Sequence, residues 1–97
     1  MKPSHGEVTV NDAPTKARLF RFCEKKIDQW LSSHSELTGP DSSEIDFRVA
    51  FIEEEETRQI ACETEIRVAG SIYKGHDLAG DTQQAFMQSM KRLQPVH

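Results

Sequence analysis

Few side chains in this sequence could do nucleophilic or acid–base chemistry. The chain has two cysteines and four histidines. Either cysteine, Cys23 or Cys62, could form a nucleophile–base pair with His34 or His76. Both cysteines fall on predicted core-facing positions, where a cysteine packs as a small apolar side chain. We therefore expect both thiols to be reduced and unreactive.

His76 and Asp77 form the best acid–base pair by exposure, because they follow a glycine in a predicted loop. A small hydrolase-like enzyme that uses these two residues is one function the sequence leaves open. The sequence contains no GxSxG motif, no phosphate-binding glycine loop and no dinucleotide fingerprint. We therefore expect a protein without enzymatic activity and without a cofactor.

Metal-ligand patterns are also missing from the sequence. No two histidines share a ligand spacing such as HxxxH, and there is no Cys-x-x-Cys motif. The acidic run at residues 53–56 lacks the alternating oxygen ligands and central glycine of a calcium loop. We expect no specific metal site.

That acidic run belongs to the stretch FIEEEETR, residues 51–58, in which four glutamates follow an apolar strand. Strict alternation before and after it, in EIDFRVAFI and QIACETEIRV, predicts two half-buried antiparallel strands. The inward-facing residues are odd-numbered in the first strand and even-numbered in the second. The residue numbers of two positions that lie opposite each other must therefore add up to an odd number. We expect the glutamates at the exposed tip of this hairpin.

A sum of 111 is the register that we predict for the hairpin. It sets Arg48 opposite Glu63 and Glu44 opposite Arg67, and these two opposite-charge pairs support it. The same register places the tip at residues 54–57. Glutamates at such a tip could simply solvate the turn and guard the hairpin against edge-to-edge pairing.

The remaining elements follow from periodicity and end signals. Apolar residues at helical spacing predict a helix over Thr15–His34. A capping pattern at Asp81 or Thr82 predicts a second helix that ends before Pro95. A third, shorter strand is expected around Ser71–Lys74, and the segment EVTV could add a short edge strand.

The predicted order is thus (β)αβββα. We expect an α+β fold in which a three-stranded antiparallel sheet carries two helices on one face. Residues 15–94 form the single domain. Residues 1–14 are a mobile N-terminal segment with an optional short edge strand, and residues 95–97 are a tail.

The net charge of −4 is unevenly distributed. Residues 35–66 hold ten acids against two basic residues, whereas the segments before and after each carry an excess of two positive charges. Such a field favours cationic partners and repels phosphate backbones. The sequence has no apolar run of bilayer length and no signal-peptide core at its start, so we expect a cytoplasmic protein without membrane binding.

The αβββα order over residues 15–94 resembles the double-stranded-RNA-binding domain in topology. That family grips phosphates with a lysine cluster at the start of its second helix. This sequence has GDTQQA there, with Asp81 and no lysine. The resemblance therefore implies no function, and direct nucleic-acid binding is not expected.

The first predicted helix has a basic face that carries Arg18, Arg21 and Lys25. Phe22 projects among these residues, and an exposed aromatic beside arginine is typical of an interface hot spot. Phe22 could equally pack against the EVTV segment. These four residues form a secondary interface candidate.

By elimination, we expect a small acidic protein that acts by protein–protein binding. Its hairpin tip and outer sheet face would occupy a basic site on a partner, as in inhibitors, immunity proteins and nucleic-acid mimics. The alternative is an adaptor or homodimer that pairs through a sheet edge or the Phe22 helix face. The predicted partner-binding residues are Glu53, Glu54, Glu55, Glu56, Asp46, Glu63 and Glu65.

Overall fold

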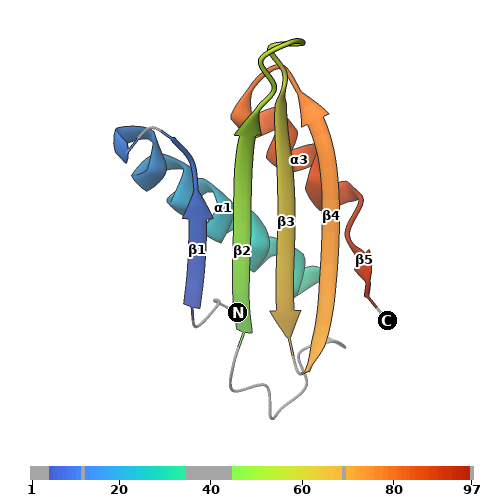
Figure 1. Cartoon of the computed structure of the whole chain (residues 1–97). Coiled ribbons are helices and arrows are strands. Elements are labelled where there is room, and N and C mark those ends of the chain that lie inside the picture. Colours follow the sequence, from blue (N-terminus) through green and yellow to red (C-terminus); the bar gives the residue numbers. More distant parts are fainter. Residues whose placement is uncertain (1–4, 12, 35–44, 69, 97) are drawn as a thin grey trace.

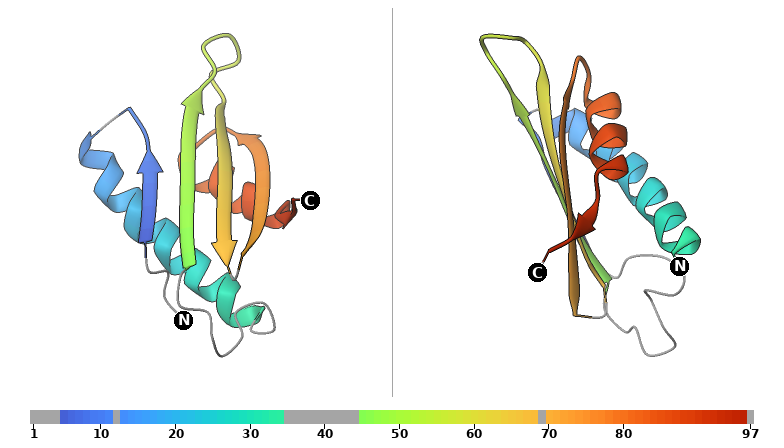
Figure 2. Two further views of the ribbon diagram at one scale, coloured as in Figure 1. Left: turned by 60° about the horizontal axis from the view of Figure 1, so that its bottom comes forward. Right: turned by 90° about the vertical axis from the view of Figure 1, so that its right-hand side faces the viewer.

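The structure is a computed structural model that describes residues 5–11, 13–34, 45–68 and 70–96. Its elements in chain order are β1 (His5–Thr9), α1 (Ala13–Ser33), β2 (Ile45–Glu53), β3 (Ile60–Val68), β4 (Ser71–Ala79), α3 (Thr82–Lys91) and β5 (Gln94–Pro95) (Figure 1). The strands form one sheet, and both helices lie on the same side of it (Figure 2). The predicted α+β class is confirmed.

The sheet is larger and more mixed than predicted. It has five strands in the order β1-β2-β3-β4-β5, and β1 runs parallel to β2, with Val8 opposite Val49. The parallel pairing arises because α1 crosses over the sheet between these two strands. At the other edge, β5 pairs with only Tyr73 and Lys74 of β4.

The core lies between the sheet and the helices. The apolar stripe of α1 is buried as its spacing predicts, at Leu19, Cys23, Ile27 and Leu31. From α3, Phe86 is fully buried. The alternation of β2 and β3 also holds, since their odd and even residues, respectively, face the helices. The other face of the sheet, here called the outer face, carries no helix (Figure 2).

The hairpin register differs from the predicted one by two residues. Paired numbers in β2 and β3 add up to 113, so Arg48 lies opposite Glu65 and Asp46 opposite Arg67. Both registers bring opposite charges together, and charge pairing therefore could not discriminate between them. The turn that joins the two strands spans residues 54–59, and its midpoint lies one residue later than that of the predicted tip at residues 54–57.

The third strand is longer than predicted, because Gly75 is not a turn residue. β4 continues through Gly75 to Ala79, so His76 and Asp77 lie within a strand rather than in a loop. α3 passes directly over this glycine, and a Cβ at position 75 would collide with the Ser89 carbonyl oxygen and lie 3.0 Å from the Leu93 nitrogen. Glycine inside a strand is typical of such a close approach.

The predicted start of the second helix is correct. Asp81 is the N-cap of α3, and its carboxylate accepts a hydrogen bond of 2.8 Å from the Gln84 amide. The loop expected over residues 35–44, which includes Glu44, lies outside the described residues, as do residues 1–4. No helix in the described part of the chain is long and apolar enough to cross a membrane.

Candidate functional site

The four glutamates predicted as the binding residues are gathered at the hairpin end. Glu53 ends β2, the next three glutamates lie in the turn, and all four are exposed. We call these residues, 53–56, the acidic tip. The turn extends past β4 and both helices (Figure 1).

Two backbone hydrogen bonds close the turn beneath the acidic tip. The Glu54 amide donates to the Gln59 carbonyl, and the Arg58 amide donates to the Glu54 carbonyl, each at 2.8 Å. Arg58 takes a left-handed conformation, with φ of 57°, to complete the turn. The glutamate backbones are therefore held in a defined geometry rather than in an open loop.

The other three predicted residues do not join the acidic tip. Asp46 stands seven residues before Glu53 on the same strand, which is roughly 24 Å along the sheet. Glu65 lies 3.5 Å from Arg67 and 3.6 Å from Lys74. The expected continuous acidic surface is thus divided into a tip and a separate group on the outer face.

Charges on the outer face are nearly balanced. A further ion pair joins Arg48 to Glu7 of β1 at 3.8 Å. On the described strands this face carries four acids and three basic residues, namely Glu7, Asp46, Glu63, Glu65, Arg48, Arg67 and Lys74. Among the described residues of the sheet and its hairpin, negative charge is concentrated at the acidic tip.

An apolar row next to the acidic tip was missed by the sequence analysis. Ile52, Ala61 and Leu78 are direct neighbours across β2, β3 and β4 on the outer face. Ile52 is 58% exposed and Leu78 40% exposed. The predicted register set Ile52 opposite Gln59 instead of Ala61, and β4 was predicted to end before Leu78. Both differences hid this row from the sequence analysis.

The secondary candidates on α1 are only partly as predicted. Arg18, Arg21 and Lys25 are exposed. Phe22 is half-buried, and its ring contacts Phe86 of α3 edge-on, with 5.8 Å between the ring centroids. It therefore joins the two helices instead of projecting alone among basic residues.

A groove between the two helices extends from Phe22. Two adjoining hollows of about 350 and 490 Å³ share Lys26, Met87 and Lys91, and Trp30 lines the second. None of the described residues that line these hollows is an aspartate or glutamate. Lys26 lies 5.8 Å from the Phe22 ring centroid, a cation–π geometry. We call this feature the helix groove.

In space, charge separates by layer. The two helices with the caps of α3 hold seven basic residues and three acids: Lys16, Arg18, Arg21, Lys25, Lys26, Lys91, Arg92, Glu24, Asp28 and Asp81. The described strands and hairpin turn hold nine acids and four basic residues. A protein of negative net charge thus carries a basic helix layer.

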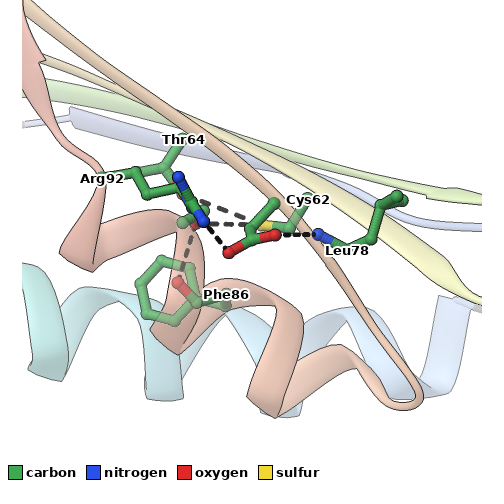
Figure 3. Close-up of polar contacts among 7 residues, drawn as sticks. Cys62, Thr64, Leu78, Phe86 and Arg92 are labelled. Carbon is green, nitrogen blue, oxygen red and sulfur yellow. Dashed lines mark hydrogen bonds and ion pairs between the residues drawn. The ribbon is translucent and has the colours of Figure 1, made fainter.

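His76 and Asp77 do not form an acid–base pair. Their side chains point to opposite faces of β4, because neighbouring strand residues alternate. The Asp77 carboxylate accepts from Arg92 Nε and from the Leu78 amide, each at 2.8 Å (Figure 3). The Arg92 hydrogen bond is the main cause that holds the pKa of Asp77 below its usual value.

A second groove, of about 730 Å³, follows the edge of β4. It lies where α3 leads into β5, and His76 lines it together with Lys74, Lys91 and Arg92. Glu63 is the single acid in its lining. We call this feature the edge groove.

Comparisons of the chain with models of known protein families, with curated proteins and with solved structures found no match. The function therefore has to be argued from these surfaces.

The buried polar groups are structural. Ser89 Oγ donates to the Phe86 carbonyl at 2.7 Å and lies 2.7 Å from Thr64 Oγ1 (Figure 3). Cys62 packs beside this pair, and burial raises the pKa of both Cys62 and Cys23. Neutral, inaccessible thiols are poor nucleophiles. Within the described residues, no group of three potential metal ligands comes together.

Proposed function

We propose that this protein is a non-enzymatic binding protein whose acidic tip occupies a basic site on a partner protein. The observation that carries the proposal is the position of four exposed glutamates at the end of a closed hairpin that projects past the rest of the sheet. A projecting tip can enter a concave site, which a flat sheet face cannot. Inhibitors, immunity proteins and nucleic-acid mimics are the classes that bind in this way.

The turn geometry favours binding by reducing its entropic cost. The two hydrogen bonds beneath the acidic tip already hold the backbone, so fewer degrees of freedom are lost on association. Four like charges also steer a basic partner toward the tip and speed the encounter.

The apolar row favours a protein partner over a small cation. Ile52 and Leu78 offer exposed apolar surface directly beside the glutamates. A charged rim around an apolar contact is the usual composition of a protein interface. The balanced charges farther along the outer face contribute little in this proposal, which limits the interface to the hairpin end.

Capture of partners from lysate tests the proposal. Wild-type protein is immobilised beside a tip variant with Glu53, Glu54, Glu55 and Glu56 changed to glutamine. The matched control changes Asp46→Asn, Glu63→Gln and Glu65→Gln on the outer face. Bound proteins are identified by mass spectrometry at low and moderate salt.

We expect a basic protein that is held by the wild type and by the outer-face variant, lost by the tip variant, and weakened by salt. Retention of the same proteins by all three baits would overturn the proposal. If only the outer-face variant fails to capture the partner protein, the binding surface is the outer face and not the acidic tip.

A second candidate function is binding of an extended polyanion, such as single-stranded nucleic acid, at the helix layer. The observation that favours it is the helix groove, where the described lining residues include aromatic, methionine and lysine side chains and no carboxylate. Aromatic rings that stack on bases, beside cations that contact phosphates, are typical of single-strand binding. The described acids among those that disfavoured nucleic acid along the sequence, at residues 46–65, lie in the other layer.

Fluorescence anisotropy with labelled single-stranded RNA and DNA tests this second function. Lys26→Ala should weaken binding and reduce the dependence of log Kd on log salt by about one unit. The matched control is Arg48→Ala, which removes one positive charge from the outer face and should leave binding unchanged. Equal effects of the two substitutions, or no binding at low salt, would exclude the helix groove as the site.

A further inference from the structure

The edge of β4 that faces away from β3 is only partly covered within the described residues. β5 pairs with Tyr73 and Lys74, and the Val96 amide donates to the Ile72 carbonyl at 2.8 Å. Beyond Lys74, no described strand flanks β4 up to its end at Ala79 (Figure 1). The sheet thus has an open edge about four residues long.

The direction of the backbone groups identifies His76 as the open position. Because Ile72 faces β5, every second residue after it also points its amide and carbonyl outward, namely Lys74, His76 and Leu78. Lys74 pairs with Gln94, and the Leu78 amide already donates to the Asp77 carboxylate. The His76 amide and carbonyl remain available to another chain.

The edge groove runs beside this open edge and is mainly basic. Lys74 and Arg92 each contact one carboxylate, and their side chains are still 47% and 66% exposed. Lys91 has no carboxylate within ion-pair distance among the described residues. The acidic side chains of an extended peptide bound along this edge would lie close to these cations on both faces of its backbone.

We propose that the open edge of β4 binds an extended acidic segment of a partner protein as an added antiparallel or parallel strand. Main-chain hydrogen bonds to His76 supply the attachment, and the basic side chains of the edge groove select acidic sequences. Lys91 also lines the helix groove, and Leu78 also belongs to the apolar row beside the acidic tip, but His76 lies in neither of those surfaces. Substitutions at His76 therefore test this proposal independently of both proposed functions.

A proline substitution at position 76 gives a sharp test. His76→Pro removes the outward amide, and proline is tolerated on a strand edge whose amides face solvent. The preceding residue is Gly75, which adapts readily to a following proline. The matched control is His76→Thr, which also removes the imidazole but keeps the amide and suits a strand.

The probe is a fluorescent peptide of about ten residues in which glutamate alternates with valine or threonine. We expect His76→Thr to bind it within about threefold of wild type and His76→Pro to bind it at least about tenfold more weakly. The same peptide with lysine in place of glutamate should not bind. Circular dichroism confirms that both variants are folded.

Amide hydrogen exchange on the wild-type protein is the second measurement, and it does not depend on any variant. The acidic peptide should slow exchange at His76 more than at any amide of α1 or β1. Equal binding by the proline and threonine variants would overturn the proposal, as would protection confined to the helices. Protection of His76 without peptide, together with a dimer in sedimentation, would make a second copy of the chain the occupant instead.

Discussion

Gly75 is the residue whose absent side chain most clearly determines the structure. A Cβ there would collide with the backbone of Ser89 and lie 3.1 Å from the Arg92 carbonyl carbon. Backbone atoms cannot rotate away as a flexible side chain can. We therefore expect Gly75→Ala to push α3 off the sheet and cost about 1–3 kcal/mol, as overpacking does.

The measurement is thermal unfolding followed by circular dichroism. For a domain of this size, that loss lowers the Tm by at least about 4 °C. Gly80→Ala is the control, because a Cβ at Gly80 meets no atom within 4 Å. If both substitutions leave the Tm unchanged, α3 does not pack against β4 as closely as described.

Asp77 gives a second prediction, which concerns the pH dependence of stability. Its pKa is held below the usual 3.8, so the folded state favours the carboxylate. That contribution is fully present above the ordinary pKa and is lost as pH falls through the lower, folded value. Asp77→Asn keeps an oxygen that can accept from the Leu78 amide but removes the charge.

Urea unfolding of wild type and Asp77→Asn checks the sign of this effect. At pH 7 the variant should unfold at a lower urea concentration than the wild type. The difference should shrink as pH falls below about 4, and it should vanish only below the lowered pKa of the folded state, where the wild-type carboxyl is also neutral. A difference that is independent of pH would mean that the Arg92 contact contributes no charge-dependent stability.

At the scale of elements, the hairpin turn explains why the register could not be predicted from its strands. Alternation fixes only which face each residue takes, and both registers satisfy it. A left-handed residue closes the turn, and in the predicted register that position falls on Thr57. Threonine is β-branched and strongly disfavours this conformation, so the turn shifts by one residue and uses Arg58.

Arg58→Gly tests this account of the turn. The left-handed conformation costs an ordinary residue about 1–2 kcal/mol. Glycine avoids that cost but loses about 0.5–1 kcal/mol more backbone entropy on folding. The difference between the two terms is a gain of up to about 1.5 kcal/mol, and urea unfolding should show a higher midpoint. Arg58→Val should lower it. The same midpoint for both would contradict a left-handed Arg58.

The other elements show which sequence signals are reliable. Helical spacing identified α1 and α3, because a buried stripe repeats several times over each helix. The predicted third strand ended too early because Gly75 was interpreted as a turn residue. In the structure this glycine marks the close approach of α3 to β4. β5 has only two residues, and its pairing depends on where α3 ends. Such short elements have no periodicity of their own.

At the scale of the whole molecule, the sequence predicted the charge blocks but not their separation into layers. The described part of the acidic third, residues 45–66, forms the hairpin of β2 and β3. The basic residues of α1 and α3 meet only because both helices cover one face of the sheet (Figure 2). The predicted acidic site was too large for a related reason. Side chains of opposite sign on neighbouring strands neutralise the outer face, and that pairing depends on the register.

The two layers should act as independent charged surfaces. The molecule measures 45 × 28 × 18 Å, and charges are screened over about 8 Å at physiological salt. A ligand therefore responds to the local layer rather than to the net charge of −4. With a pI near 5.5, a uniformly charged protein would pass through a cation exchanger at pH 7. We expect this protein to be retained at low salt through its helix layer.

Paired charge reversals separate this expectation from a net-charge effect. Arg21→Glu with Lys25→Glu reverses two of the three charges on the basic face of α1, whereas Arg48→Glu with Arg67→Glu makes the same change of net charge on the outer face. The first variant should elute without retention, and the second should elute close to the wild type, because its substitutions lie in the layer that faces away from the resin. Elution of both variants at the same salt concentration would show that net charge alone governs the interaction, and the helix layer would then lose its support as a binding surface for polyanions.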